Sequence, residues 1–358
     1  MGAKQSTSSA KLLIAASGTG GHLFPAIALA QQLPDYSIEW LGVPDRLETE
    51  LVPQEYPLHQ VRMGGVQGRI GFSILRLGQQ FFSSIIQIRR LLQRGGFQAV
   101  FTTGGYIAAP AIIAARTLGL PTVLHESNAL PGKVTRWLSP RCSIVAVGFE
   151  AATSYLPKAK TICVGTPVRS QFLTAAEPLD LEIPDNAPVI VVIGGSQGAV
   201  AVNQLVRQAA PAWFEAGAWI VHLTGNSDPD ANSLSHPQYI HRPFYPHMAA
   251  LFRRANLSIS RAGAGTLTEL AITGTPSILI PYPYAAEDHQ TYNAQAFVSA
   301  GAARLQQQSS LSAEQLQEMV LELIQSPAQL ATMGAAAEGL ATADSAQKLA
   351  DVVRGLVG

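Results

Sequence analysis

The sequence contains little charge and almost no cysteine. Charged residues occupy 13% of its 358 positions, and 24 Lys and Arg balance 24 Asp and Glu, so the formal net charge is zero. A hydrophobic fraction of 47% excludes a largely disordered chain, and the balanced charge gives no reason to expect nucleic-acid binding. Cys142 and Cys163 are too few for a disulfide scaffold, and their apolar surroundings predict buried, reduced thiols.

Signals for membrane insertion and for metal binding are also missing. The apolar run at residues 12–16 is too short for the core of a signal peptide. Residues 95–115 carry no charge, but their glycines and Pro110 favour a strand, a turn and a helix of a folded core over a membrane-spanning helix. No C-x-x-C pair or His/Cys cluster indicates zinc, so we expect no bound metal.

Apolar runs alternate with helix-like segments along the whole chain, which predicts an α/β fold with parallel sheets. The runs are continuously apolar, as is typical of strands that are buried on both faces. Strands are expected at residues 11–16, 38–42, 99–102, 122–125, 143–147, 189–193, 219–223, 239–242, 257–260 and 277–281.

A change of composition divides the chain into two halves. Residues 174–188 are rich in Pro, Asp and Glu and poor in large apolar side chains. We therefore expect an N-terminal Rossmann-like domain over residues 1–170, a linker over 171–187 and a C-terminal Rossmann-like domain over 188–340. A last helix, over 341–358, is expected to pack back on the N-terminal domain.

A glycine-rich turn follows the first strand of each half. Residues 17–22 are Ser-Gly-Thr-Gly-Gly-His, and residues 194–199 are Gly-Gly-Ser-Gln-Gly-Ala. In such turns backbone N–H groups approach a phosphate closely at the start of a helix. Leu23 stands where a dinucleotide-binding fingerprint needs its third glycine, and no Walker lysine follows either turn. Both facts argue against a dehydrogenase and against ATP hydrolysis.

Three polar positions are candidates for chemistry. A helix start disfavours imidazolium, so His22 is expected to be a neutral proton acceptor; the alternative is that it only caps the helix. Glu269 lies one turn into a helix that follows a strand, where a carboxylate can accept hydrogen bonds from ribose hydroxyls, or is simply a surface residue. Asp228 and Asp230 match the Asp-x-Asp of metal-dependent glycosyltransferases, but we interpret this segment as a solvated turn.

Six motifs together resemble the MurG family over nearly the whole chain. They occupy residues 17–25, 104–106, 125–128, 165–169, 194–199 and 261–269, in the family's order. The resemblance implies a GT-B fold, in which two Rossmann-like domains with parallel sheets face each other across a cleft. It also implies inverting transfer of N-acetylglucosamine from its UDP donor to the 4-OH of the muramoyl sugar of lipid I, a step of peptidoglycan synthesis.

The resemblance carries roles to individual residues. His22 is expected to be the base, with Glu126 as its rival. The acceptor is expected to meet Gly18, Gly104, Gly105 and Tyr106. UDP-N-acetylglucosamine is expected to contact Thr19, Gly20, Gly21, Asn128, Arg169, Ser196, Tyr245, Ala264, Gly265, Thr266, Leu267, Thr268, Glu269 and Gln290.

Helix N-termini and Arg169 can stabilise the departing diphosphate, so no tightly bound cofactor is expected, although a divalent cation could stimulate the reaction. Three positions depart from common family residues: Ser127, Thr166 and His289. The nearest alternatives are a related glycolipid synthase that uses diacylglycerol, a UDP-sugar epimerase and a non-catalytic nucleotide-sugar binder.

A basic, acid-free stretch suggests how the chain meets a lipid substrate. Between Tyr56 and His125 there is no Asp or Glu, but there are seven arginines. Up to Ser170 the chain holds 16 Lys and Arg against 8 Asp and Glu, and beyond it these numbers are reversed. We expect peripheral docking on the anionic cytoplasmic leaflet of the bacterial inner membrane, where cell-wall synthesis and division proteins would be its partners. The expected patch consists of Ile74, Leu75, Phe81, Phe82, Arg89 and Arg90.

Overall fold

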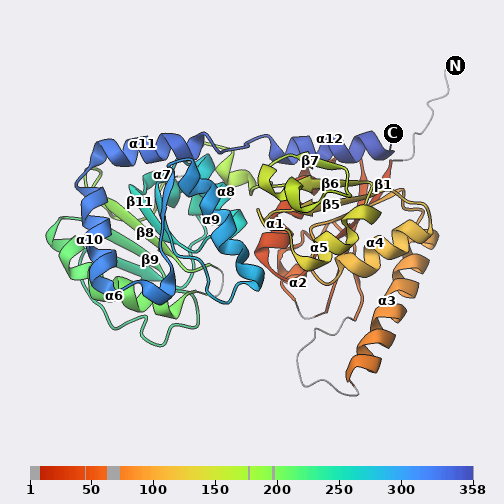
Figure 1. Cartoon of the computed structure of the whole chain (residues 1–358), viewed down its shortest axis with the longest axis horizontal. Coiled ribbons are helices and arrows are strands. Elements are labelled where there is room, and N and C mark those ends of the chain that lie inside the picture. Colours follow the sequence, from red (N-terminus) through yellow and green to blue (C-terminus); the bar gives the residue numbers. More distant parts are fainter. Residues whose placement is uncertain (1–8, 45, 63–72, 176–177, 196–197, 358) are drawn as a thin grey trace. The chain divides into compact units, whose positions relative to one another are not determined.

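The computed structural model describes residues 9–44, 46–62, 73–175, 178–195 and 198–357, without the side chains of residues 73–77. The chain divides into two compact units (Figure 1). Unit 1 consists of Met1–Ser127, Pro131–Arg169 and Asp344–Gly358, and unit 2 of Asn128–Leu130 and Ser170–Ala343. Each unit contains one parallel sheet with helices around it.

The described part of unit 1 forms a seven-stranded sheet in the order β3-β2-β1-β4-β5-β6-β7, with every pair parallel. The order reverses between β1 and β4, and open α/β sheets bind ligands at the carboxyl ends of strands at such a point. The strands are β1 (Lys11–Ala15), β2 (Ser37–Gly42), β3 (Leu58–Gln60), β4 (Ala99–Thr102), β5 (Thr122–Glu126), β6 (Ile144–Val147) and β7 (Thr161–Cys163). The helices are α1 (Gly20–Gln31), α2 (Glu48–Leu51), α3 (Ser73–Gly95), α4 (Ala108–Thr117), α5 (Lys133–Leu138) and α12 (Ser345–Val357).

The described part of unit 2 repeats this plan with a six-stranded parallel sheet, in the order β10-β9-β8-β11-β12-β13. Its order reverses between β8 and β11. The strands are β8 (Val189–Ile193), β9 (Trp219–Leu223), β10 (Tyr239–Arg242), β11 (Leu257–Ser260), β12 (Ser277–Leu279) and β13 (Ala303–Leu305). The helices are α6 (Val200–Glu215), α7 (Met248–Arg254), α8 (Ala264–Ile272), α9 (His289–Ser299), α10 (Ala313–Ile324) and α11 (Pro327–Glu338).

The last helix, α12, packs within unit 1 although it follows unit 2 in the sequence. Its Leu349, Ala350 and Val353 are buried in the same apolar cluster as Leu12 of β1, and Arg354 donates to the backbone oxygen of Gln32 at the end of α1. The segment expected to be a linker also belongs to a unit. Phe172 is buried, and its ring lies 6.2 Å from that of Phe252 in unit 2.

The predicted strands are present within one or two residues, and three further strands occur that the sequence did not predict. β3, β7 and β13 are three residues long and lie at sheet edges, where little apolar surface is buried and the sequence signal is weak. The prediction of buried thiols is wrong for Cys163, which is exposed on β7, while Cys142 is half-buried. No helix among the described residues is both long and apolar enough to cross a bilayer.

Candidate functional site

In unit 1 the first glycine-rich turn connects β1 to α1, and neighbouring strands fix it from both sides. The Thr102 hydroxyl of β4 donates to the backbone oxygen of Ala15 at 2.6 Å. On the other side, the Trp40 indole of β2 donates to the backbone oxygen of Ala16 at 2.8 Å. The turn therefore starts from two anchored carbonyl groups at the carboxyl ends of the central strands.

His22 lies in the first turn of α1, half-buried. Its Nδ1 is 2.7 Å from the backbone oxygen of Thr103, which follows β4. A carbonyl oxygen only accepts, so Nδ1 carries a proton, and in the neutral ring Nε2 keeps its lone pair. This is the tautomer that a proton acceptor needs.

Gly104 and Gly105 form a turn beside that imidazole ring. Both have positive φ angles, 90° and 73°, which favour glycine. A Cβ placed on Gly105 would lie 3.8 Å from His22 Nε2, and one on Gly104 would lie 3.8 Å from His22 Cε1. The structure thus brings the predicted base together with two predicted acceptor residues, and Tyr106 follows them with 65% of its surface exposed.

Glu126, the rival base, is buried at the end of β5. Its Oε2 accepts hydrogen bonds from the Gly132 amide at 3.2 Å and from the Thr135 hydroxyl at 2.7 Å, which fastens the start of α5 to β5. His125 beside it is fully buried, with Nε2 2.9 Å from the Gly165 backbone oxygen, and burial lowers its pKa. These contacts favour structural roles for both side chains.

The remaining predicted residues of unit 1 surround the start of α1. Thr19 is the N-cap residue, and Gly20 and Gly21 form the first turn. A Cβ on Gly20 would lie 2.7 Å from the Phe24 ring, so glycine there makes room for Phe24. The Arg169 guanidinium lies 4.9 Å from the centre of that same ring, which places a cation beside the helix that carries His22.

In unit 2 the second glycine-rich turn connects β8 to α6, and two of its glycines have no room for a side chain. A Cβ on Gly194 would lie 2.3 Å from the Ala199 nitrogen, and one on Gly198 would lie 2.3 Å from the Thr224 backbone oxygen. Gly198 also has a φ of 76°. Gly198 therefore packs closely against the residue that follows β9. Ser196, an expected donor contact, lies outside the described residues.

The start of α8 follows β11 and carries a run of predicted UDP contacts. Ala264, Gly265, Thr266, Leu267 and Thr268 all lie in its first turns, and Gly263 is the N-cap. Leu267 is fully buried. Glu269 is half-buried on the same helix.

Two amide side chains of α9 hold the neighbouring loops in place. Gln290 Oε1 accepts from the Ala262 amide at 3.2 Å and from the Tyr282 amide at 2.9 Å. Asn293, buried, donates from Nδ2 to the Ala262 backbone oxygen and to Asn128 Oδ1, both at 3.1 Å. Sequence reasoning named Gln290 and Asn128 as donor contacts, which stays a prediction, but missed Asn293, which orients Asn128. With its oxygen engaged, Gln290 offers a ligand its amide nitrogen.

Tyr245 follows β10, and its ring is buried. Its hydroxyl donates to the Asp180 carboxylate, and burial together with that carboxylate raises the pKa of Tyr245 to about 12. The Tyr245 side chain is therefore engaged within the protein, and the expected contact of Tyr245 with UDP-N-acetylglucosamine stays a prediction. The preceding Phe244 is 68% exposed, and an exposed ring at a strand end offers a flat surface to a base.

The interpretation of residues 228–230 as a solvated turn is wrong for Asp228. Its side chain is buried, with Oδ2 2.7 Å from Arg207 Nη1 and 2.7 Å from Asn203 Nδ2. Although burial raises the pKa of Asp228, these two donors outweigh burial and lower it. The carboxylate thus has a structural partner in Arg207. No cluster of three metal-ligating side chains occurs among the described residues.

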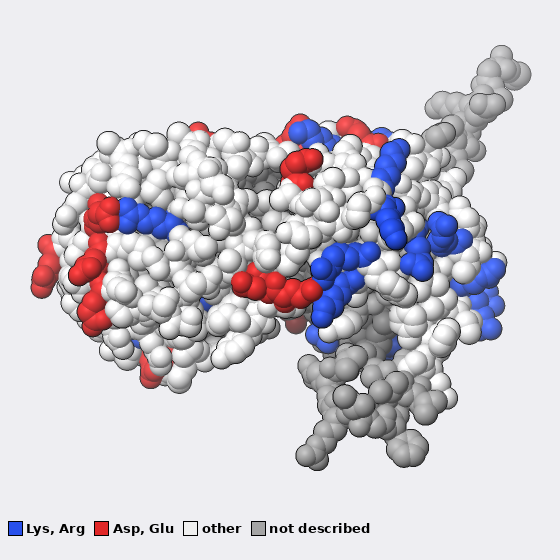
Figure 2. All heavy atoms as spheres, viewed as in Figure 1, with Lys and Arg blue, Asp and Glu red and all other residues white. Residues whose placement is uncertain are grey.

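Most of the Lys and Arg visible in Figure 2 lie on unit 1. On α3, Phe82 is 68% exposed and Ile86, one turn later, is 50% exposed. Phe81 is half-buried against an apolar cluster, Arg89 donates to the Thr117 hydroxyl at 3.3 Å, and Arg90 is exposed. The side chains of Ile74 and Leu75 lie outside the described residues.

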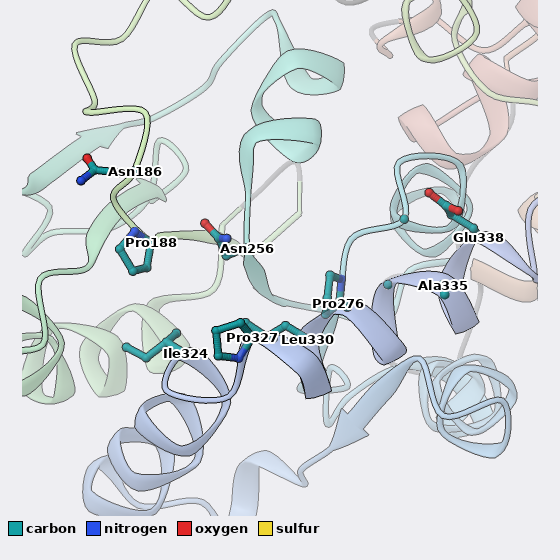
Figure 3. A pocket seen from close by; sticks show the side chains of 12 residues that line it. Asn186, Pro188, Asn256, Pro276, Ile324, Pro327, Leu330, Ala335 and Glu338 are labelled. Atoms are coloured by element: carbon teal, nitrogen blue, oxygen red, sulfur yellow. The ribbon is translucent and has the colours of Figure 1, made fainter.

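A pocket of about 580 Å³ lies in unit 2 at the end of the sheet where the strands begin, opposite the second glycine-rich turn. Figure 3 shows it between the segments that precede β8, β11 and β12 and the helices α10 and α11. Its lining residues include Asn186, Pro188, Asn256, Pro276, Ile324, Pro327, Leu330, Ala335 and Glu338. This edge holds the amino ends of the strands, away from the glycine-rich turns.

Both units match models of one enzyme family. Residues 12–147 match the glycosyltransferase family 28 N-terminal domain, and residues 189–350 match the glycosyltransferase family 28 C-terminal domain. The two matches lie in the expected order and together cover most of the chain.

Similar sequences and a solved structure agree with these matches. The UDP-N-acetylglucosamine–N-acetylmuramyl-(pentapeptide) pyrophosphoryl-undecaprenol N-acetylglucosamine transferase of a Nostoc species is 66% identical, over 97% of this chain and 98% of its own. The transferase of the same name from Trichodesmium erythraeum is 62% identical, over 96% and 91%. The crystal structure of Acinetobacter baumannii MurG is similar with a TM-score of 0.76 and 28% identity, over 97% and 99%.

Proposed function

The chain belongs to the MurG family of N-acetylglucosaminyltransferases, and we propose that it transfers N-acetylglucosamine from UDP-N-acetylglucosamine to the 4-hydroxyl of the muramoyl sugar of lipid I. The products are lipid II and UDP. The observation that supports the mechanism is the 2.7 Å contact between His22 Nδ1 and the Thr103 carbonyl, because in the neutral ring this contact leaves the lone pair on Nε2, beside Gly105.

In the proposed step, His22 Nε2 takes the proton of the acceptor hydroxyl. The oxygen attacks the anomeric carbon of the donor from the face opposite UDP, and the bond from that carbon to the β-phosphate oxygen breaks. The electron pair of that bond leaves with UDP, and the anomeric configuration inverts. General base catalysis of this kind contributes about 10²–10⁴-fold to the rate.

Unit 2 supplies the groups that suit the donor. The amides at the starts of α6 and α8 point positive helix poles at the carboxyl edge of the sheet, where a leaving diphosphate gains stabilisation without a tightly bound cofactor. Glu269 would accept from the ribose hydroxyls and Gln290 would donate to the sugar. Stimulation by a divalent cation stays a prediction.

Unit 1 is proposed to meet the lipid acceptor at the anionic membrane surface. The support is the exposed pair Phe82 and Ile86 on α3, with the exposed Arg90 one turn beyond Ile86. An apolar face next to arginines suits peripheral binding to anionic lipids. Cell-wall synthesis and division proteins as further partners stay a prediction.

The test is His22→Ala, assayed by UDP release with a lipid I analogue. We expect kcat to fall by about 10²–10⁴-fold, with the affinity for UDP-N-acetylglucosamine unchanged. His59→Ala is the matched control, because His59 is a half-buried histidine of the same unit that pairs with Glu39. Near-normal turnover in His22→Ala would remove the base role.

The same assay separates the transferase from its alternatives. Epimerisation of the donor sugar without acceptor would support an epimerase, and transfer to diacylglycerol would support a glycolipid synthase. Binding without turnover would support a nucleotide-sugar binder. A Listeria monocytogenes UDP-N-acetylglucosamine 2-epimerase resembles the chain with a TM-score of 0.70 but 14% identity, a likeness of fold alone.

A further inference from the structure

A buried carboxylate, Glu48, lies against the first glycine-rich turn. Glu48 is the first residue of the short helix α2, which follows β2, and it is fully buried. A fully buried acidic side chain is rare unless it is paired or well hydrogen-bonded. Its partners therefore indicate what it does.

Three donors meet this carboxylate, two of them from the turn itself. Glu48 Oε1 accepts from the Ser17 hydroxyl at 2.6 Å and from the Val43 amide at 2.7 Å, and Oε2 accepts from the Gly18 amide at 3.1 Å. Gly42 makes room for it, because a Cβ there would lie 2.7 Å from Glu48 Cγ. The carboxylate thus connects the end of β2 to the turn after β1.

The bond between Glu48 and the Gly18 amide affects how the first glycine-rich turn can bind a phosphate. The Gly18 amide is the kind of group that binds a phosphate in a glycine-rich turn, but here an internal carboxylate already occupies it. A negative charge at that point also opposes a second anion. The Gly18 amide is therefore engaged with Glu48, so the expected contact between Gly18 and the acceptor cannot use this amide while that bond holds.

The same contacts reach the surroundings of the proposed base. A Cβ on Gly105 would lie 3.9 Å from the Ser17 backbone oxygen and 3.8 Å from His22 Nε2. Ser17, which Glu48 holds, and His22, which Thr103 holds, thus both lie next to Gly105. The angle at which His22 presents Nε2 depends on the turn that joins them.

We propose that Glu48 is a positioning residue of the transfer reaction. Its carboxylate fixes the Ser17–Gly18 turn, keeps the Gly18 amide from the acceptor diphosphate and sets the position of His22. This inference rests on the proposed function, in which His22 Nε2 accepts the proton. A misplacement of about 1 Å in a reacting group costs about 10²-fold in rate, so loss of the carboxylate is expected to act on turnover.

The kinetic test is Glu48→Gln, which keeps the size but replaces one acceptor by a donor that faces the Gly18 amide. We expect kcat with a lipid I analogue to fall about 10–100-fold. KM for UDP-N-acetylglucosamine should stay within about twofold, because Glu269, Gln290 and the starts of α6 and α8, which are proposed to hold the donor, belong to unit 2. Glu50→Gln, an exposed position two residues away, is the matched control and should match wild type. Wild-type kcat in a folded Glu48→Gln would overturn the proposal.

A second readout does not depend on activity. In glycine-selective NMR spectra, the Gly18 amide proton of the wild type is expected downfield, and Glu48→Gln should move it upfield. Inorganic pyrophosphate should leave this amide resonance unmoved in the wild type; a specific shift of this amide on adding pyrophosphate would contradict the proposal.

A second variant covers the case in which Glu48→Gln does not fold. Ser17→Ala removes one of the three hydrogen bonds to Glu48, and we expect kcat to fall about 2–10-fold. An unchanged kcat in Ser17→Ala would count against the role of Glu48. A wild type that makes no lipid II would instead refute the proposed function.

Discussion

Arg207 of α6 and Asp228 after β9 form a buried ion pair, with Nη1 and Oδ2 2.7 Å apart. The same Oδ2 accepts from Asn203, whose Nδ2 also donates to the Thr224 backbone oxygen at 2.9 Å. That oxygen is the atom that leaves no space for a Cβ on Gly198. Through Asn203 and Thr224, the ion pair thus supports the glycine-rich turn at the proposed diphosphate site.

Asp228→Asn should destabilise unit 2 strongly. The variant leaves the Arg207 guanidinium buried without its counter-charge, and breaking a buried pair in this way costs about 3–5 kcal/mol. Chemical unfolding with urea measures the change. Asp230→Asn, two residues later and exposed, is the control and should stay within about 0.5 kcal/mol of wild type. Equal stability of the two variants would mean that the buried pair contributes nothing.

The pH dependence of stability should carry a contribution from His222. Burial, then the nearby Arg207, lowers its pKa to about 3, whereas an unfolded histidine titrates near 6.5. As the pH falls below about 6.5, the unfolded chain takes up a proton that the folded chain refuses, so stability falls between pH 6.5 and 3. The full contribution is on the order of 5 kcal/mol.

Urea midpoints measured from pH 7 to pH 4 in the wild type and in His222→Gln check this. Gln cannot titrate, so the variant should lose less stability on acidification, although its stability at pH 7 is lower. Parallel slopes in the two proteins would exclude His222 as the source. The pH dependence of the wild-type midpoint alone cannot identify His222, because carboxylates titrate in the same pH range.

The sequence predicted what depends on local pattern. Continuous apolar runs gave the central strands, and the two glycine-rich turns marked the carboxyl ends of β1 and β8 at the reversals of strand order. His22 stood out because it begins a helix after such a turn. Its tautomer, however, depends on Thr103, 81 residues away, which no local pattern connects to it.

Residues that act through distant partners escaped the sequence analysis. Glu48 meets Ser17 across 31 positions, and Asn293 meets Asn128 across 165. Neither side chain belongs to a recognisable motif, and each matters only because the sheet topology brings its partner near. Asp228 was misread for the same reason, since turn-forming neighbours surround it in sequence while its partner Arg207 lies on another element.

Gly198→Ala should disable the donor site. A φ of 76° strains any side chain, and the new Cβ would lie 2.3 Å from the Thr224 backbone oxygen, so we expect a loss of about 3 kcal/mol or more. KM for UDP-N-acetylglucosamine should rise at least about tenfold as the turn shifts. Gly217→Ala is the control, because Gly217 has a φ of 80° but nothing within 4 Å of its Cβ, and about 1 kcal/mol is expected there. If both variants lost the same stability and had the same KM, backbone strain alone would explain the effect, and the contact with Thr224 would contribute nothing.

Replacing Phe82 and Ile86 by serine should weaken membrane binding without touching catalysis. Both side chains are exposed on α3, so the folded unit loses little, whereas burial of a large apolar side chain in a membrane interface is worth about 1.5–3 kcal/mol. We therefore expect co-sedimentation with vesicles that contain anionic lipid to fall at least about tenfold. Turnover of a water-soluble acceptor should be unchanged. Ile162→Ser, at an exposed position on β7 of the same unit, is the control; if it lowers vesicle binding as much, α3 is not the docking surface.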